Sequence, residues 1–129
     1  VTCHSYRQYL RGGPRPVYKD GIPQVTASPT RGAVGTRVRI EGAGFTDQMW
    51  RQGGDDLWLV GDGGDGCFLY ADAQHNVRIG SDGLLTGDFV VPAGGGCRQE
   101  EREAAVRPGS YSIAYRCTPC FIGEFEVTG

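Results

Sequence analysis

The chain has 129 residues, of which 22% are charged and 39% hydrophobic, as is typical of one globular domain rather than a disordered segment. Its net charge of −2 gives no general attraction to nucleic acid, and no apolar run of about 18 residues is present to span a membrane. The 22 glycines and seven prolines disfavour helices and favour a turn-rich, all-β domain.

The first segment, residues 1–21, is polar and carries several aromatic side chains. It is interrupted by glycines and prolines between Gly12 and Pro16, so we expect an extended N-terminal arm there. Regular strands begin with Pro23–Pro29, which is bounded by prolines. Thr36–Gly42 alternates apolar and charged residues and predicts a half-buried strand, with Val38 and Ile40 on its inner face.

The middle of the chain contains further strand patterns separated by turn residues. We expect strands at Asp56–Val60, Cys67–Ala71, Val77–Ile79 and Leu84–Val91, with a loop at Gly61–Gly66. The last of these strands has the strongest pattern, because three apolar residues share one of its faces: Leu85, Phe89 and Val91.

The C-terminal third contains the only helical pattern that we find. Arg98–Ala105 lacks an apolar stripe and is short, so we expect one or two loose helical turns or a mobile loop. Tyr111–Cys117 and Phe121–Thr128 predict two more strands. The inward residues of these strands are expected to be Tyr111, Ile113, Tyr115, Cys117, Phe121, Phe125 and Val127. About seven short strands predict an immunoglobulin-like β-sandwich over residues 22–129.

A resemblance to a known family supports the same fold. The stretch from Ile22 to Asp47 resembles the opening of IPT/TIG domains, which have an immunoglobulin-like sandwich. The matching residues are Ser28, Pro29, Gly32, Gly35, Thr36, Val38, Ile40, Gly42, Gly44 and Phe45. The resemblance implies a bacterial, secreted module, and members serve as spacers, adhesion modules, accessories of carbohydrate enzymes and receptor ectodomains.

Lys19 is the only lysine among 13 basic residues, and this arginine bias is typical of a GC-rich, actinobacterial genome.

The layout is also similar to that of the small chromophore carriers of the neocarzinostatin group. Those proteins likewise have paired cysteines and a Gly-Ala-Gly strand end, which here is formed by Gly42 to Gly44. That resemblance implies an alternative function, the carriage of a small molecule. A carrier requires a concave apolar cavity of several hundred Å³, whereas a spacer requires none.

The five cysteines favour an oxidising compartment, and therefore a secreted or cell-surface protein. Cys117 and Cys120 flank two residues between predicted strands, a separation that a disulfide can bridge. Cys67–Cys97 is then expected by elimination, with Cys3 left over. Three alternatives stay open: a redox site at Cys117-Thr-Pro-Cys120, a cross-pairing of Cys3, and a zinc site formed by Cys3, His4, Cys117 and Cys120.

The sequence contains no convincing catalytic motif. No serine lies in a nucleophile elbow, and no paired carboxylates occupy a cleft motif, so we expect no enzyme activity and no cofactor. The Asp/Gly stretch at residues 61–66, with Asp55 and Asp56 before it, has oxygen ligands for calcium. It lacks the EF-hand spacing and occurs once, so we interpret it as a solvated loop and expect no metal.

Two tryptophans are assigned different roles. Trp58 is expected to pack in the core, as a tryptophan on a third strand does in this fold. Trp50 and Arg51 are predicted to form a contact site for a partner, the alternative being that Trp50 folds back on the sandwich. The contact loops are expected at Thr46–Asp55 and Gly94–Arg107. We therefore predict a non-catalytic extracellular or cell-surface binding or spacer module, whose ligand is a protein, a carbohydrate or a small molecule.

Overall fold

The computed structural model describes residues 21–52, 55–62, 68–97, 102–116 and 120–129. The described chain is all-β except for the four-residue helix α2 (Met49–Gln52). The first sheet has the order β1 (Val25–Ser28), β3 (Arg37–Gly42), β7 (Leu85–Val90), β6 (His75–Ile79). The second has the order β2 (Arg31–Gly32), β11 (Phe121–Val127), β10 (Gly109–Tyr115), β4 (Leu57–Asp62), β5 (Phe68–Asp72), β8 (Gly94–Cys97), β9 (Arg102–Ala105). The predicted arm lies outside the described residues, except for Gly21.

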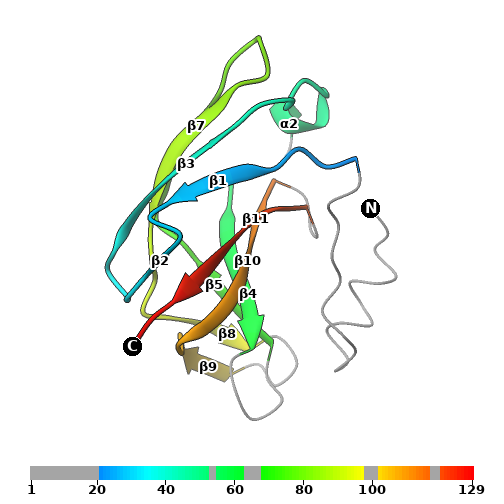
Figure 1. The fold of residues 1–129 in the computed structure, drawn as a ribbon. Coiled ribbons are helices and arrows are strands. Elements are labelled where there is room, and N and C mark those ends of the chain that lie inside the picture. The colour runs from blue at the N-terminus through cyan, green and yellow to red at the C-terminus, as the bar shows by residue number, and fades with distance from the viewer. Residues whose placement is uncertain (1–20, 53–54, 63–67, 98–101, 117–119) are drawn as a thin grey trace.

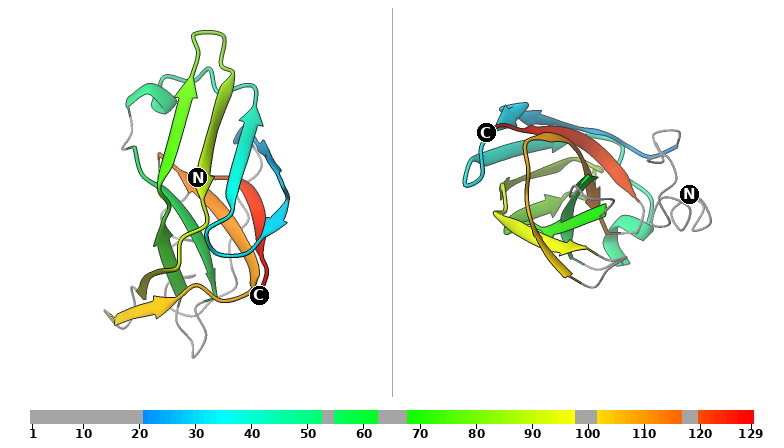
Figure 2. Two further views of the ribbon diagram at one scale, coloured as in Figure 1. Left: turned by 90° about the vertical axis from the view of Figure 1, so that its left-hand side faces the viewer. Right: turned by 90° about the horizontal axis from the view of Figure 1, so that it is seen from below.

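The two sheets pack against each other around one hydrophobic core, as in a β-sandwich (Figures 1 and 2). Val38 and Ile40 of β3 are fully buried, which confirms the alternation predicted for that strand. Leu85 and Phe89 of β7 are buried on the same side. The Phe89 ring meets Phe125 of the opposite sheet edge to face, with ring centroids 5.7 Å apart. Aromatic pairs in this geometry add to the apolar burial that holds the sheets together.

Phe121 does not face the main core as the sequence predicted. The pairing of β10 with β11 shifts by one residue, because Ile113 pairs with Gly123 while Ala114 pairs with Phe121. A bulge of this kind inserts one extra residue, here Ile122, and reverses the faces of the residues before it. Ile122 consequently packs in the main core, and Phe121 packs on the opposite face of the seven-stranded sheet.

Trp58 also lies on that opposite face, so the prediction of a central tryptophan is wrong. Its β4 neighbour Leu59 occupies the core position, and Trp58 is only partly buried. The Trp58 ring packs edge to face on Tyr70 at 6.1 Å. Period-two alternation places one or other set of β4 side chains inward. Because β4 has apolar residues on both faces, the sequence alone did not determine which face packs in the core.

The segment that was predicted as a loose helix or loop ends in a strand. β9 pairs antiparallel with β8, in a register that places Gly96 opposite Glu103 and Gly94 opposite Ala105. β8 itself pairs with β5, so the hairpin extends the seven-stranded sheet. The exposure of residues 103–106 alternates along the chain, with Val106 buried. Sheet pairing has overridden a weak local helical preference.

Tyr111 fastens the start of β10 to the connection before it. Its hydroxyl donates to Arg107 O at 2.7 Å and accepts from Arg107 N–H at 3.1 Å. The ring is 1% exposed and packs against β4 at Gly61, where an added Cβ would lie 2.4 Å from a ring carbon. The hydroxyl thus satisfies two backbone groups at the turn into the sheet.

Tyr111→Phe is expected to lower the free energy of unfolding by about 1 to 3 kcal/mol, because it removes the partner of two backbone groups while preserving the ring. Urea unfolding followed by circular dichroism measures the effect. A variant as stable as the parent would show that these hydrogen bonds contribute nothing net.

Candidate functional site

Trp50 is buried rather than exposed. Its side chain is 1% exposed, and its ring packs edge to face on Phe45 at 5.0 Å. α2 begins where Asp47 Oδ1 accepts from the backbone N–H of Met49 at 3.0 Å, a capping bond that turns Trp50 back toward the sandwich. The predicted exposed position of Trp50 is therefore wrong, and the alternative that it folds back is correct.

Arg51 is exposed, as a contact residue must be. Its guanidinium donates to Ser81 O at 3.3 Å, which joins α2 to the turn between β6 and β7. That end of the molecule also presents Met49, 37% exposed, and Leu84, 47% exposed. Arg51 consequently belongs to a small mixed surface, which Trp50 anchors from beneath.

The two predicted contact loops do not form one surface. α2 and the β6–β7 turn lie at one end of the molecule, and β8 and β9 lie at the other (Figure 1). Any ligand that bound both segments would have to span the length of the sandwich. The two segments are therefore separate candidate sites.

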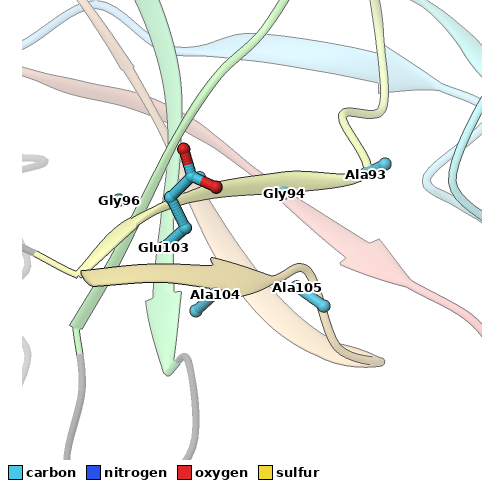
Figure 3. A pocket seen from close by; sticks show the side chains of 7 residues that line it. Ala93, Gly94, Gly96, Glu103, Ala104 and Ala105 are labelled. Carbon is cyan, nitrogen blue, oxygen red and sulfur yellow. The ribbon is translucent and has the colours of Figure 1, made fainter.

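The β8–β9 end carries a groove of about 600 Å³. A second hollow, of about 360 Å³, lies against β10 and β11. The larger groove is lined by Ala93, Gly94, Gly95, Gly96, Glu103, Ala104 and Ala105. Glu103 is the only charged residue in this described lining, and Figure 3 shows its carboxylate projecting from β9 beside the glycine strand.

The register of the hairpin explains the shape of this groove. Residues directly opposite each other in an antiparallel pair share one face, so Gly94, Gly96, Glu103 and Ala105 face the same way. The other face carries Ala104, which packs against the core. Larger residues on β8 would fill the space above its outer face, but Gly94 and Gly96 leave the backbone bare there.

Two neighbouring glycines have opposite environments. A Cβ added to Gly95 would lie 2.2 Å from Tyr70 O, because β8 approaches the backbone of β5 closely at that point. A Cβ added to Gly96 would meet nothing within 4 Å. Gly95 is therefore required by packing, whereas Gly96 leaves open space on the groove side.

A polar cluster joins the chain before β4 to the start of β6 and the end of β10. The Tyr115 hydroxyl donates to Asp55 Oδ1 at 3.2 Å, and His75 Nε2 lies 3.9 Å from the same oxygen. His75 Nδ1 lies 2.8 Å from Ala73 O. Because a carbonyl oxygen only accepts, Nδ1 carries the proton of the neutral ring. This cluster holds the three segments together. Neither the groove at β8 and β9 nor the hollow at β10 and β11 is lined by a residue of this cluster.

Burial raises the pKa of the Tyr115 phenol above its ordinary value of 10.0, and Asp55 raises it further, while Arg116 opposes the shift. The folded state therefore holds this proton to higher pH than the unfolded state does. Stability linked to Tyr115 is complete below about pH 10 and is lost as the pH rises beyond it, because the unfolded state releases the proton first.

We accordingly expect the urea midpoint of the parent to fall above about pH 10 more steeply than that of Tyr115→Phe, which has no phenolic proton. Unfolding curves recorded at several pH values measure both slopes. Equal slopes in the two proteins would contradict the raised pKa.

The structure describes only some of the predicted disulfide residues. Cys120 is fully buried. Cys117, Cys67 and Cys3 lie outside the described residues, as does the side chain of Cys97, so the pairings Cys117–Cys120 and Cys67–Cys97 stay predictions.

The Asp/Gly stretch is described only at its start. Gly61 and Asp62 belong to β4 rather than to the predicted loop, and residues 63–66 lie outside the described residues. Within the part of the chain that is described, no group of three or more His, Cys, Asp or Glu side chains is arranged to hold a metal ion.

Gly96 and Glu103 lie within the predicted contact loop Gly94–Arg107, but the hairpin that they form and its groove were not predicted. The sequence Glu-Ala-Ala-Val at residues 103–106 does not alternate polar and apolar residues, so it gave no period-two signal for the strand. No family model, no curated protein and no solved structure matches the chain. None of the described helices is long and apolar enough to cross a membrane.

Proposed function

We propose that the chain is a non-catalytic binding module of the cell surface or the extracellular space, built on an immunoglobulin-like sandwich, with its binding site on the β8–β9 hairpin. The groove of about 600 Å³ on that hairpin is the observation that carries the function. Function resides in sites added to a fold rather than in the fold itself. The hairpin is such an addition, because it extends one sheet beyond the strands that cover the core.

The strand orders support the immunoglobulin-like part of the proposal. That fold places strands A, B, E and D in one sheet and C, F and G in the other. The order β1-β3-β7-β6 has the places of A, B, E and D, and β4, β10 and β11 have those of C, F and G. The Tyr111–Arg107 contact supports it too, because a tyrosine at the start of strand F bonds to preceding backbone in many such domains.

Two features depart from antibody-type domains. Trp58 on β4 faces away from the core, and neither β3 nor β10 contains a cysteine for a bond between the sheets. The narrower assignment to IPT/TIG domains rests on the motif from Ile22 to Asp47. The five cysteines support secretion, since disulfide bonds persist in oxidising compartments.

The proposal is tested by titrating the ¹⁵N-labelled chain with three probe sets: a glycan panel, a random peptide library and a small-molecule fragment library. We expect a ligand whose amide shift changes centre on Gly94–Gly96 and Glu103–Ala105. Gly96→Val should abolish these changes while preserving the fold, because the Gly96 site has open space and valine favours strands. Shift changes confined to the α2 end, chemical conversion of a probe, or no ligand at the hairpin would refute the proposal.

Carriage of a small molecule is a second candidate, favoured by the groove volume. About 600 Å³ lies within the range of ligand pockets, which is roughly 300 to 1,000 Å³. The described lining is formed by glycine, alanine and Glu103, without the aromatic side chains that usually line such pockets. In the same titration, hits restricted to the fragment library would select this candidate over a protein or glycan ligand.

A further inference from the structure

The groove lies beside a free strand edge. β9 is the last strand of the seven-stranded sheet and has one neighbour, β8, among the described strands. A strand at a sheet edge presents unpaired N–H and C=O groups that can pair with another extended chain. β9 contains no proline, and its residues Ala104 and Ala105 are small enough to let another backbone approach.

The hydrogen bonding of the hairpin identifies the groups on that edge. Val106 N–H donates to Ala93 O at 2.9 Å, toward β8. Successive residues of an antiparallel strand point their N–H groups to opposite sides, so Ala104 also donates toward β8. The N–H groups of Glu103 and Ala105 therefore point to the free edge. Two backbone donors stand beside the only charged side chain of the described groove lining.

The charge of the groove selects among ligands. Glu103 is exposed, and it shares the outer face of the hairpin with Gly94, Gly96 and Ala105. A cross-strand neighbour of opposite charge stabilises an antiparallel pair. The bare glycine backbone leaves room for the apolar stem of a long basic side chain, whose charged end would meet the Glu103 carboxylate.

We infer that the β8–β9 hairpin binds an extended peptide segment of a partner protein, which adds to β9 as a further strand and places a lysine or arginine against Glu103. This inference rests on the proposed function and names the ligand class of the same site. Main-chain pairing supplies affinity in this mode of recognition, and the side-chain contacts supply specificity.

The test uses a phage-displayed library of random seven-residue peptides selected on the full chain. Selected peptides should be enriched in lysine or arginine. Their affinity should fall about two- to fivefold for Glu103→Gln, the size of one exposed ion pair, and further for Glu103→Lys, where like charges meet. Glu41→Gln is the matched control, because Glu41 is an exposed strand carboxylate of the other sheet, paired with Arg39 at 2.8 Å. It should bind as the parent does.

Two further variants test the backbone contacts. Ala105→Pro removes an edge N–H but no hydrogen bond to β8, and should weaken the selected peptides about tenfold or more. Gly96→Val fills the groove and should weaken them as well, with circular dichroism confirming that both variants are folded. Should Ala105→Pro not fold, the two Glu103 substitutions decide the question alone.

The inference is overturned if no peptide is selected, if selected peptides lack basic residues, or if they bind Glu103→Lys as tightly as the parent. A glycan or fragment whose shift changes centre on the hairpin would then leave the proposed binding function standing and remove only the peptide ligand. Failure of every probe at the hairpin would remove both.

Discussion

Replacing Phe89 by alanine is expected to lower the free energy of unfolding by about 3 to 5 kcal/mol, the cost of truncating a buried aromatic side chain. Phe89 is fully buried, and its ring contacts Phe125 across the two sheets. β7 lies between β3 and β6, so the cavity would open in the middle of the four-stranded sheet. Urea unfolding followed by circular dichroism measures the loss.

Leu84→Ala provides the matched control. Leu84 lies just before β7 and is 47% exposed, so its truncation should change the stability by less than about 0.5 kcal/mol. If Phe89→Ala unfolded at the same urea concentration as Leu84→Ala, the inner face assigned to β7 would be wrong.

Trp50→Ala is expected to cost a similar amount, about 3 to 5 kcal/mol, because it removes the largest fully buried side chain among the described residues. The substitution also removes the ring contact with Phe45, which holds α2 on the end of the sandwich. A surface tryptophan would instead be replaced at almost no cost in stability. Thermal unfolding distinguishes the two positions directly.

Met49 supplies the control for Trp50, since it belongs to the same short helix and is 37% exposed. Met49→Ala retains a good helix former and should alter the unfolding free energy by less than about 0.5 kcal/mol. A parent-like melting temperature for Trp50→Ala would restore the contact role that the sequence suggested.

The strands β3 and β7 could be predicted closely because apolar residues recur at alternate positions on their buried faces. Val38 and Ile40 alternate with charged residues, and Leu85 and Phe89 follow the same rule. The same rule misplaced Phe121, because the bulge at Ile122 depends on the register with β10. A bulge depends on which strand pairs with which, and alternation within one strand does not contain that information.

The hairpin was missed for a different reason. The charged run before Ala105 is rich in residues that favour helices. Gly94–Gly96 consists of glycine alone, which disfavours strands. β8 pairs with β5, and β9 pairs with β8, and this sheet pairing outweighs the local propensity of both segments. The groove exists because glycine has no side chain to fill it. No motif of functional groups in the sequence therefore indicated the groove. The exposure of Arg51 could be predicted from the sequence. The burial of Trp50 could not be predicted, because it depends on how α2 packs against the sandwich.

The most direct test of the account is a nuclear Overhauser measurement on the hairpin, because the groove and the free edge both require it. The register predicts strong contacts between the α protons of Gly96 and Glu103, and between those of Gly94 and Ala105. These residues form the pairs without mutual hydrogen bonds, in which Cα atoms are about 4.5 Å apart. Sequential amide contacts of a helix reaching Ala105, without the cross-strand α-proton contacts, would contradict the hairpin and the site built on it.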